Sequence, residues 1–74
     1  MDNIFKDRLK GLRKEKRMTQ KEMGEYLGLS LRAYQSYEYG TRYPEFPGLI
    51  KLADFFDVSL DYLVGRSSHR EREP

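Results

Sequence analysis

The 74-residue sequence contains no cysteine and a single histidine, His69. Without cysteine there are no disulfides, thiolate metal ligands or cysteine nucleophiles, and one histidine cannot form a zinc-binding cluster by itself. The longest uninterrupted apolar run, residues 62–64, is far too short to span a membrane, and the charged start lacks the apolar core of a signal peptide. We therefore expect a small cytoplasmic domain that is held together by packing, without metal, cofactor or membrane association.

The polar residues do not favour an enzyme. The sequence has no glycine-rich phosphate loop between a strand and a helix, and no pair of carboxylates that we expect to face inward. Asp57 and Asp61 are better explained by the capping and the dipole of a short last helix. We therefore expect a binding function and no catalysis.

Charge is distributed unevenly along the chain. The formal net charge is only +2, although 35% of the residues are charged. Residues 1–21 carry eight Lys and Arg against three Asp and Glu, whereas residues 45–64 carry one against four. The basic end is suited to approach a polyanion such as DNA or RNA. On charge alone, ordinary variation along a highly charged surface is the better explanation of this pattern.

Apolar residues recur at helical spacing, and no strand pattern or internal repeat is present. Phe5, Leu9 and Leu12 form one stripe and predict a basic amphipathic helix over about residues 3–17. Thr19 and Glu22 have the spacing of a capping box, which predicts the start of a second helix. Further N-cap residues predict a third and a fifth helix, and a fourth begins near Pro47 or Gly48. The remaining caps that we predict are Ser30 and Ser59 at helix starts and Gly28, Gly40 and Gly65 at helix ends.

The second and third predicted helices have the spacing of a helix-turn-helix unit. Such a unit needs a small residue where the helices cross and a turn-forming residue between them, and Gly24 and Gly28 supply these. Gly24 costs about 0.8 to 1 kcal/mol of helix propensity relative to alanine, so close helix approach explains it best. The alternative is a generic helical hairpin. The inward apolar side chains are Met23, Leu27, Leu29, Tyr34 and Tyr37.

From Phe5 to Gly65 the sequence resembles the Cro/C1-type (XRE-type) helix-turn-helix domains of phage repressors and bacterial regulators. The resemblance is carried by RL at residues 8–9, LR at 12–13, MTQKEM at 18–23, LGLS at 27–30, YEYG at 37–40, LA at 52–53 and VSLDYLVG at 58–65. It implies an all-α, five-helix, lambda-repressor-like domain over residues 3–65. We expect the polar tail that follows, residues 66–74, to be disordered.

Two features depart from the family pattern. Tyr34 stands where the family usually has Ile or Val, so its phenol needs a partner if the ring is buried. The segment PEFPG at residues 44–48 interrupts a stretch where members usually run directly into the fourth helix. The start of that helix and its cap are therefore open.

The resemblance implies sequence-specific binding of double-stranded DNA by a transcriptional regulator, commonly a repressor and a homodimer on a palindromic operator. In that family the third helix lies in the major groove. The other function that the scaffold allows is a protein-interaction module, such as an antitoxin or an adaptor.

Helical phase places Tyr34 and Tyr37 inward and exposes the opposite side of the third helix. Arg pairs well with guanine and Gln with adenine, and Leu covers a thymine methyl group. The positions that match base-contacting positions of the family are Leu31, Arg32, Gln35 and Ser36.

The resemblance and the neighbouring polar residues give the remaining candidates. Arg13 has two roles, a phosphate contact and an ion pair with Glu38, and we expect both at once. The predicted phosphate contacts are Arg13, Gln20, Tyr39, Thr41, Arg42 and Tyr43. The candidate dimer patch consists of Phe46, Ile50, Phe55 and Tyr62, which could instead complete a monomeric core.

Overall fold

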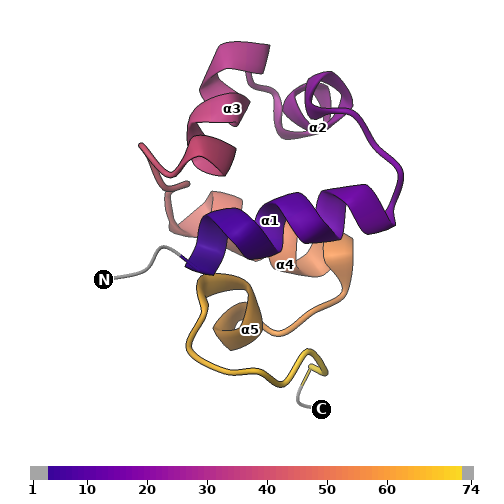
Figure 1. The fold of residues 1–74 in the computed structure, drawn as a ribbon, viewed down its shortest axis with the longest axis vertical. Coiled ribbons are helices and arrows are strands. Elements are labelled where there is room, and N and C mark those ends of the chain that lie inside the picture. Colours follow the sequence, from indigo (N-terminus) through magenta and orange to yellow (C-terminus); the bar gives the residue numbers. More distant parts are fainter. Residues whose placement is uncertain (1–3, 73–74) are drawn as a thin grey trace.

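A computed structural model describes residues 4–72. Five helices follow one another: α1 (Ile4–Glu15), α2 (Gln20–Leu27), α3 (Leu31–Tyr39), α4 (Phe46–Phe56) and α5 (Leu60–Val64). No strand occurs within residues 4–72, so the predicted all-α class is confirmed. In Figure 1, α2 and α3 lie at one end of the molecule, α1 and α4 cross its middle, and α5 with the C-terminal segment lies at the other end. Residue 3, where we placed the first helix start, lies outside the described residues.

Short-range hydrogen bonds mark most of the helix boundaries. At α2, the Glu22 backbone N–H donates to the Thr19 hydroxyl at 3.0 Å, and the Thr19 N–H donates to the Glu22 carboxylate at 2.8 Å. This is the predicted capping box. Ser30 caps α3 and Ser59 caps α5 in the same way, through the N–H three residues ahead. These local contacts explain why the boundaries of α2, α3 and α5 were readable from the sequence.

Helix α4 starts without a side-chain cap. Glu45 is its N-cap residue but makes no capping hydrogen bond, and Pro47 occupies the first turn, where its missing N–H costs nothing. The helix starts at Phe46, one residue before Pro47 and two before Gly48, near which we predicted the start. At the other end, Asp57 adopts a left-handed conformation with φ of 54° and ends α4, so it does not cap α5 as we expected.

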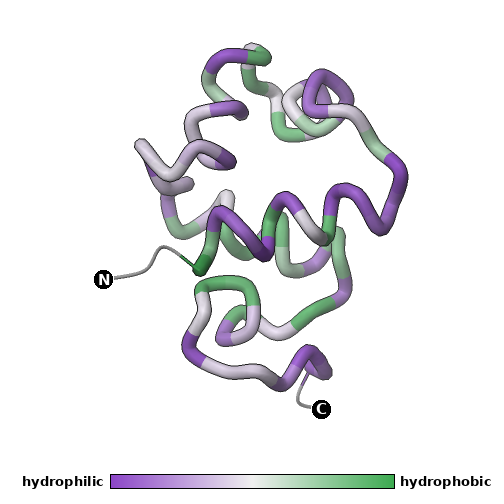
Figure 2. Tube along the Cα trace, in the orientation of Figure 1, coloured by the Kyte–Doolittle hydropathy of each residue, from purple (hydrophilic) through white to green (hydrophobic). Residues whose placement is uncertain are grey.

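The core is formed by one apolar stripe from each helix. Its largest fully buried side chains are Tyr34, Leu9, Met23, Leu52, Leu63 and Val58. Figure 2 shows hydrophobic positions along α4 and a run of hydrophilic positions from the end of α1 into the α1–α2 connection. Within residues 4–72, no helix has the length and apolar content needed to cross a membrane. In the same part of the chain, no group of three or more metal-ligating side chains is assembled.

Residues 66–72 run back along the domain, which differs from the disorder that we expected of the tail. Arg8 of α1 donates from Nη1 to the carbonyl of Ser67 at 2.6 Å, and Ser59 donates from its hydroxyl to the carbonyl of His69 at 2.9 Å. Arg70 pairs with Glu15 at 2.9 Å. The tail is held through its backbone carbonyls and through exposed ion pairs, of Arg70 with Glu15 and of Arg72 with Asp54 and Asp57, and composition does not reveal such contacts. Residues 73–74 lie outside the described part.

Candidate nucleic-acid interface

Close contact between α2 and the start of α3 fixes the helix-turn-helix unit. A Cβ atom added to the buried Gly24 would lie 3.2 Å from the carbonyl oxygen of Leu29 and 3.4 Å from that of Ser30. Both neighbours are backbone atoms, so a larger residue would push the turn away from α2. Gly28 ends α2 in the left-handed conformation, with φ of 73°. The α2–α3 turn is therefore set by two glycines, and it determines the direction in which α3 projects.

The N-terminal part of α3 presents two accessible side chains to solvent. Leu31 is 44% exposed at the first position of the helix. Arg32 follows it and is exposed, and its side chain makes no hydrogen bond or ion pair to any residue between 4 and 72. An arginine whose donors are all available is suited to a bidentate contact with guanine or with a phosphate.

The other two predicted base-contacting residues are half-buried and already engaged. Ser36 donates from its hydroxyl to the carbonyl oxygen of Ala33 at 2.6 Å, so it retains only acceptor capacity. Gln35 donates from Nε2 to Oε1 of Gln20 at 2.9 Å. The structure thus places all four predicted residues on α3, but only Leu31 and Arg32 lie open to solvent.

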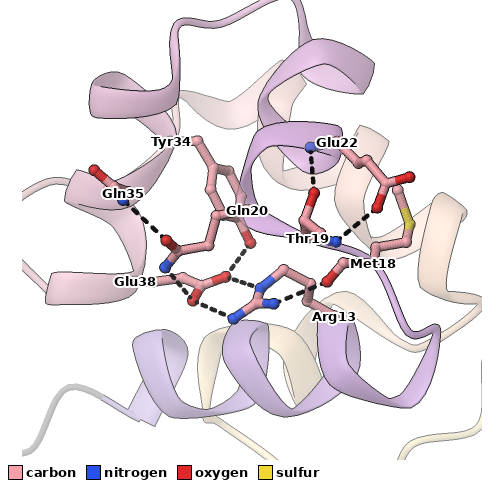
Figure 3. Close-up of polar contacts among 8 residues, drawn as sticks. All are labelled: Arg13, Met18, Thr19, Gln20, Glu22, Tyr34, Gln35 and Glu38. Atoms are coloured by element: carbon pink, nitrogen blue, oxygen red, sulfur yellow. Dashed lines mark hydrogen bonds and ion pairs between the residues drawn. The ribbon is translucent and has the colours of Figure 1, made fainter.

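Beneath α3 lies a buried carboxylate that accepts four hydrogen bonds (Figure 3). Glu38 is only 7% exposed. Its Oε2 accepts from Arg13 Nε at 2.7 Å and from the Tyr34 hydroxyl, and its Oε1 accepts from Arg13 Nη2 and Gln20 Nε2, each at 3.1 Å. Arg13 also donates from Nη1 to the carbonyl of Met18 at 2.8 Å. The contacts join α1, α2 and α3 around one charge.

Protonation in this cluster follows from its geometry. Burial by itself would raise the pKa of Glu38, but hydrogen bonds from Arg13, Tyr34 and Gln20 outweigh burial and hold that pKa below its usual value. Burial, together with the bond to Glu38, raises the pKa of Tyr34. The bond to Glu38 also raises the pKa of Arg13, against the effect of burial. At neutral pH the cluster is therefore an ion pair with one neutral phenol donor, and the phenol has the partner that its burial requires.

Gln20 connects this cluster to the surface of α3. Its Nε2 faces Glu38 and its Oε1 faces Gln35, as Figure 3 shows. A residue predicted to contact phosphate and one predicted to contact a base therefore touch each other. Sequence reasoning missed this link because 15 and 18 residues separate Gln20 from its partners. Only the crossing of α2 and α3 brings them together.

Apart from the half-buried Gln20, the predicted phosphate-contacting residues fall into two groups. Tyr39, Thr41, Arg42 and Tyr43 are all exposed at the end of α3 and in the segment after it, with Tyr39 at 63% and Tyr43 at 60%. Arg13 differs from them, since its side chain is only 12% exposed and three of its donors are used inside the protein. The structure contains the expected Arg13–Glu38 ion pair but leaves little of Arg13 for a phosphate.

The four residues of the candidate dimer patch do not form one surface. Phe46 and Ile50 lie one turn apart on α4, with exposed fractions of 65% and 37%. Phe55 comes nine residues after Phe46, which places it on the opposite side of α4, and its ring packs against Tyr26 with centroids 4.3 Å apart. Tyr62 is half-buried beneath the Arg8 guanidinium, 4.0 Å from the ring centroid. Of these four residues, only Phe46 and Ile50 are exposed apolar side chains that a partner could cover.

Comparison with known proteins agrees with this arrangement. The sequence profile of the helix-turn-helix family matches residues 9–63. The chain is 41% identical over 68 residues to the uncharacterized HTH-type transcriptional regulator YqaE of Bacillus subtilis, covering 92% of this chain and 59% of that protein. It is 38% identical over 69 residues to the cryptic phage CTXphi transcriptional repressor RstR of Vibrio cholerae, covering 93% of this chain and 62% of that protein.

A solved structure shows the same fold. The crystal structure of a transcriptional regulator from Listeria innocua superimposes with a TM-score of 0.80 at 30% sequence identity, covering 93% of this chain and 64% of that one. The chain spans about three fifths of the length of these relatives. The family match includes α2, the glycine-set turn and α3, and the chain belongs to the Cro/C1-type helix-turn-helix family.

Proposed function

We propose that this chain binds double-stranded DNA sequence-specifically, as the DNA-binding part of a transcriptional repressor, with α3 in the major groove. The observation that carries the proposal is the exposed N-terminal face of α3, where Leu31 and the unengaged Arg32 project from a rigid helix-turn-helix unit. An α-helix fits the major groove, and the N-terminal residues of a recognition helix are those that reach base edges. This role would place the protein in the cytoplasm with the DNA.

The four candidate residues on α3 divide the readout between them. Arg32 is suited to guanine because its fork of donors matches O6 and N7, and Leu31 is suited to a thymine methyl group. Gln35 retains one N–H and its carbonyl oxygen, which is the pattern that adenine requires. Ser36 can only accept a hydrogen bond, so its best partner is a base amino group, N4 of cytosine or N6 of adenine.

Exposed residues after the recognition helix supply the phosphate contacts in this proposal. Tyr39, Thr41, Arg42 and Tyr43 combine one cation with three hydroxyl groups and follow α3 directly. Gln20, at the first position of α2, is the candidate on the other side, beside the helix N-terminus. Arg13 acts instead within the fold, because its guanidinium is committed to Glu38 and Met18.

We also propose that two copies bind a palindromic operator as a homodimer. Phe46 and Ile50 are exposed apolar side chains on one side of α4, and pairing them in a symmetric dimer would remove both from water. A two-fold dimer on DNA places its recognition helices about one helical turn apart. An inverted repeat in the bound sequence is therefore expected.

The role of Arg32 provides the test. In the Arg32→Ala variant, discrimination between the selected operator and a scrambled duplex should fall by about 1 to 3 kcal/mol, measured by fluorescence anisotropy at fixed salt. Arg66→Ala is the matched control, because Arg66 is exposed and follows α5 directly in the chain. Helix α5 and the C-terminal segment lie at the opposite end of the molecule from α3. Equal affinity of the wild type for operator and scrambled DNA would refute the proposal. Binding that does not depend on salt would favour a protein-interaction module instead.

A further inference from the structure

The amide groups of Gln20 and Gln35 form an ordered series of hydrogen bonds that begins at Glu38 (Figure 3). Gln20 donates from Nε2 to Glu38 Oε1 at 3.1 Å, and Gln35 donates from Nε2 to Gln20 Oε1 at 2.9 Å. Each amide thus turns its nitrogen toward Glu38 and its oxygen away from it. The series starts at a buried group and ends at a residue on α3 that we propose reads a base.

The direction of the series follows from the chemistry of its first member. An ionised carboxylate accepts hydrogen bonds and cannot donate them, so the group of Gln20 that faces Glu38 must be its NH₂. The carbonyl oxygen of Gln20 then faces Gln35 and can only accept. Consequently Gln35 must turn its own NH₂ toward Gln20. An amide in isolation can be placed either way round, but these two have one orientation consistent with their partners.

We infer that Glu38, acting through Gln20, fixes which end of the Gln35 amide points away from α2, and that it thereby selects the orientation of the A·T pair that Gln35 reads. Glu38 is in this sense a positioning residue, because it touches no base. The inference rests on the proposed function and specifies how one of its contacts acquires a direction.

The direction matters because an A·T pair has an order of groups in the major groove. Adenine presents the N7 acceptor and then the N6 amino donor, and the order is reversed when the pair is turned to T·A. Because the nitrogen of Gln35 is bonded to Gln20, the remaining N–H of Gln35 lies on the side near Gln20 and its carbonyl oxygen lies on the side away from Gln20. This arrangement matches one orientation of the pair. The reversed amide would match the other.

The carboxylate is itself prevented from turning. Both of its oxygens are engaged by Arg13, through Nε at 2.7 Å and Nη2 at 3.1 Å, and Oε2 is also held by Tyr34. Tyr34 is completely buried, so its hydroxyl has little room to move. The Oε1 lone pair that faces Gln20 therefore stays in place, and the orientation of both amides is determined before DNA arrives.

The experiment replaces the obligate acceptor by a group of the same shape. In Glu38→Gln, the amide oxygen best replaces Oε2, where Arg13 Nε and Tyr34 donate, so the new NH₂ group takes the place of Oε1. That NH₂ group faces Gln20 and donates best to its carbonyl oxygen. Gln20 then turns its own NH₂ group toward Gln35, and Gln35 turns its carbonyl oxygen toward Gln20. The base pair that Gln35 reads is identified as the operator position whose sequence preference is lost in Gln35→Ala. Affinities are then measured for two versions of the selected operator, one with A·T and one with T·A at that position. The matched control is Glu25→Gln, which removes the same charge from an exposed position on α2.

The wild type and Glu25→Gln should prefer one orientation of this pair by about 5- to 150-fold, the range of a good bidentate contact. In Glu38→Gln we expect the preference to fall below about threefold or to invert, while preferences at the other positions change by less than about twofold. A full wild-type preference in Glu38→Gln would overturn the inference.

Glu38→Gln also weakens the partner of a buried arginine and can lower the fraction of folded protein. Gln20→Leu is the second variant, because it breaks the series and leaves the Arg13–Glu38 pair in place. It should lose the preference without inverting it, and an unchanged preference in this variant would also overturn the inference.

A readout in the free protein separates this inference from the proposed function. The side-chain amide proton of Gln35 that is bonded to Gln20 should give a distinct NMR resonance, and this resonance should move in both variants. If the wild type shows no sequence preference, the proposed function fails and the NMR shifts still decide the hydrogen-bond series. Unchanged Gln35 shifts in Glu38→Gln and Gln20→Leu would overturn it.

Discussion

The hydroxyl of Tyr34 should contribute measurably to stability, although the family usually has an aliphatic residue at this position. The side chain is fully buried, and its hydroxyl donates to the ionised Glu38. Replacement by phenylalanine keeps the ring and removes only this donor. A hydrogen bond to a charged group contributes about 1.5 to 3 kcal/mol, and Glu38 keeps three other donors, so we expect a loss of about 2 kcal/mol. For a domain of this size that loss lowers Tm by roughly 8 to 16 °C.

Tyr37→Phe provides the matched comparison for this change. Tyr37 is also on α3 and nearly buried, and its ring packs edge-on against Tyr34 with centroids 6.2 Å apart. Within residues 4–72 its hydroxyl makes no hydrogen bond to another residue, so its removal should cost less than about 0.5 kcal/mol. Urea unfolding followed by circular dichroism measures the stability of both variants. The urea concentration at the midpoint should shift, while the dependence of the unfolding free energy on urea concentration stays the same. Equal losses in the two variants would show that the bond to Glu38 contributes nothing and would refute the reasoning.

Three further results are expected. Because its pKa is lowered in the folded state, Glu38 should stabilise the protein fully above the ordinary glutamate pKa of about 4.3, and this stability should be lost as pH falls through the lower folded-state value. The difference in unfolding free energy between wild type and Glu38→Gln, followed from pH 7 to pH 3, should therefore shrink toward acid. Gly28→Ala should lower the free energy of unfolding by about 1 kcal/mol, because alanine is strained in the left-handed backbone conformation. Gly65→Ala should lower it further, because the added Cβ would also lie 2.9 Å from a side chain at the start of α1. Equal losses in the two variants would contradict this. Arg42→Gln should weaken binding to all duplexes alike and reduce the salt slope by about 0.9, whereas Arg66→Gln should not.

The sequence was most informative where structure depends on neighbours in the chain. Thr19 and Glu22 are three residues apart and form their capping box within one turn, so their spacing was enough to predict the start of α2. The same holds for Ser30 at the start of α3. By contrast, the start of α4 has no side-chain cap, and its position depends on how the preceding segment packs.

The candidate site was predictable by position but not by environment. Helical phase placed Arg32 and Gln35 on α3, yet it could not show that one is unengaged and the other is bonded to α2. Tyr34 was recognised as needing a partner, and Glu38 is that partner at one helical turn. The path of residues 66–72 was missed because its bonds join residues that are 10 to 59 positions apart.

Selection of bound duplexes from a random pool with the wild-type protein tests the central claim most directly. If α3 reads bases in the major groove, repeated rounds should enrich one motif, and a symmetric dimer should produce it as an inverted repeat. The motif should include a guanine whose enrichment disappears with Arg32→Ala. A pool that shows no enriched sequence after the same rounds, although the protein is folded, would contradict the account.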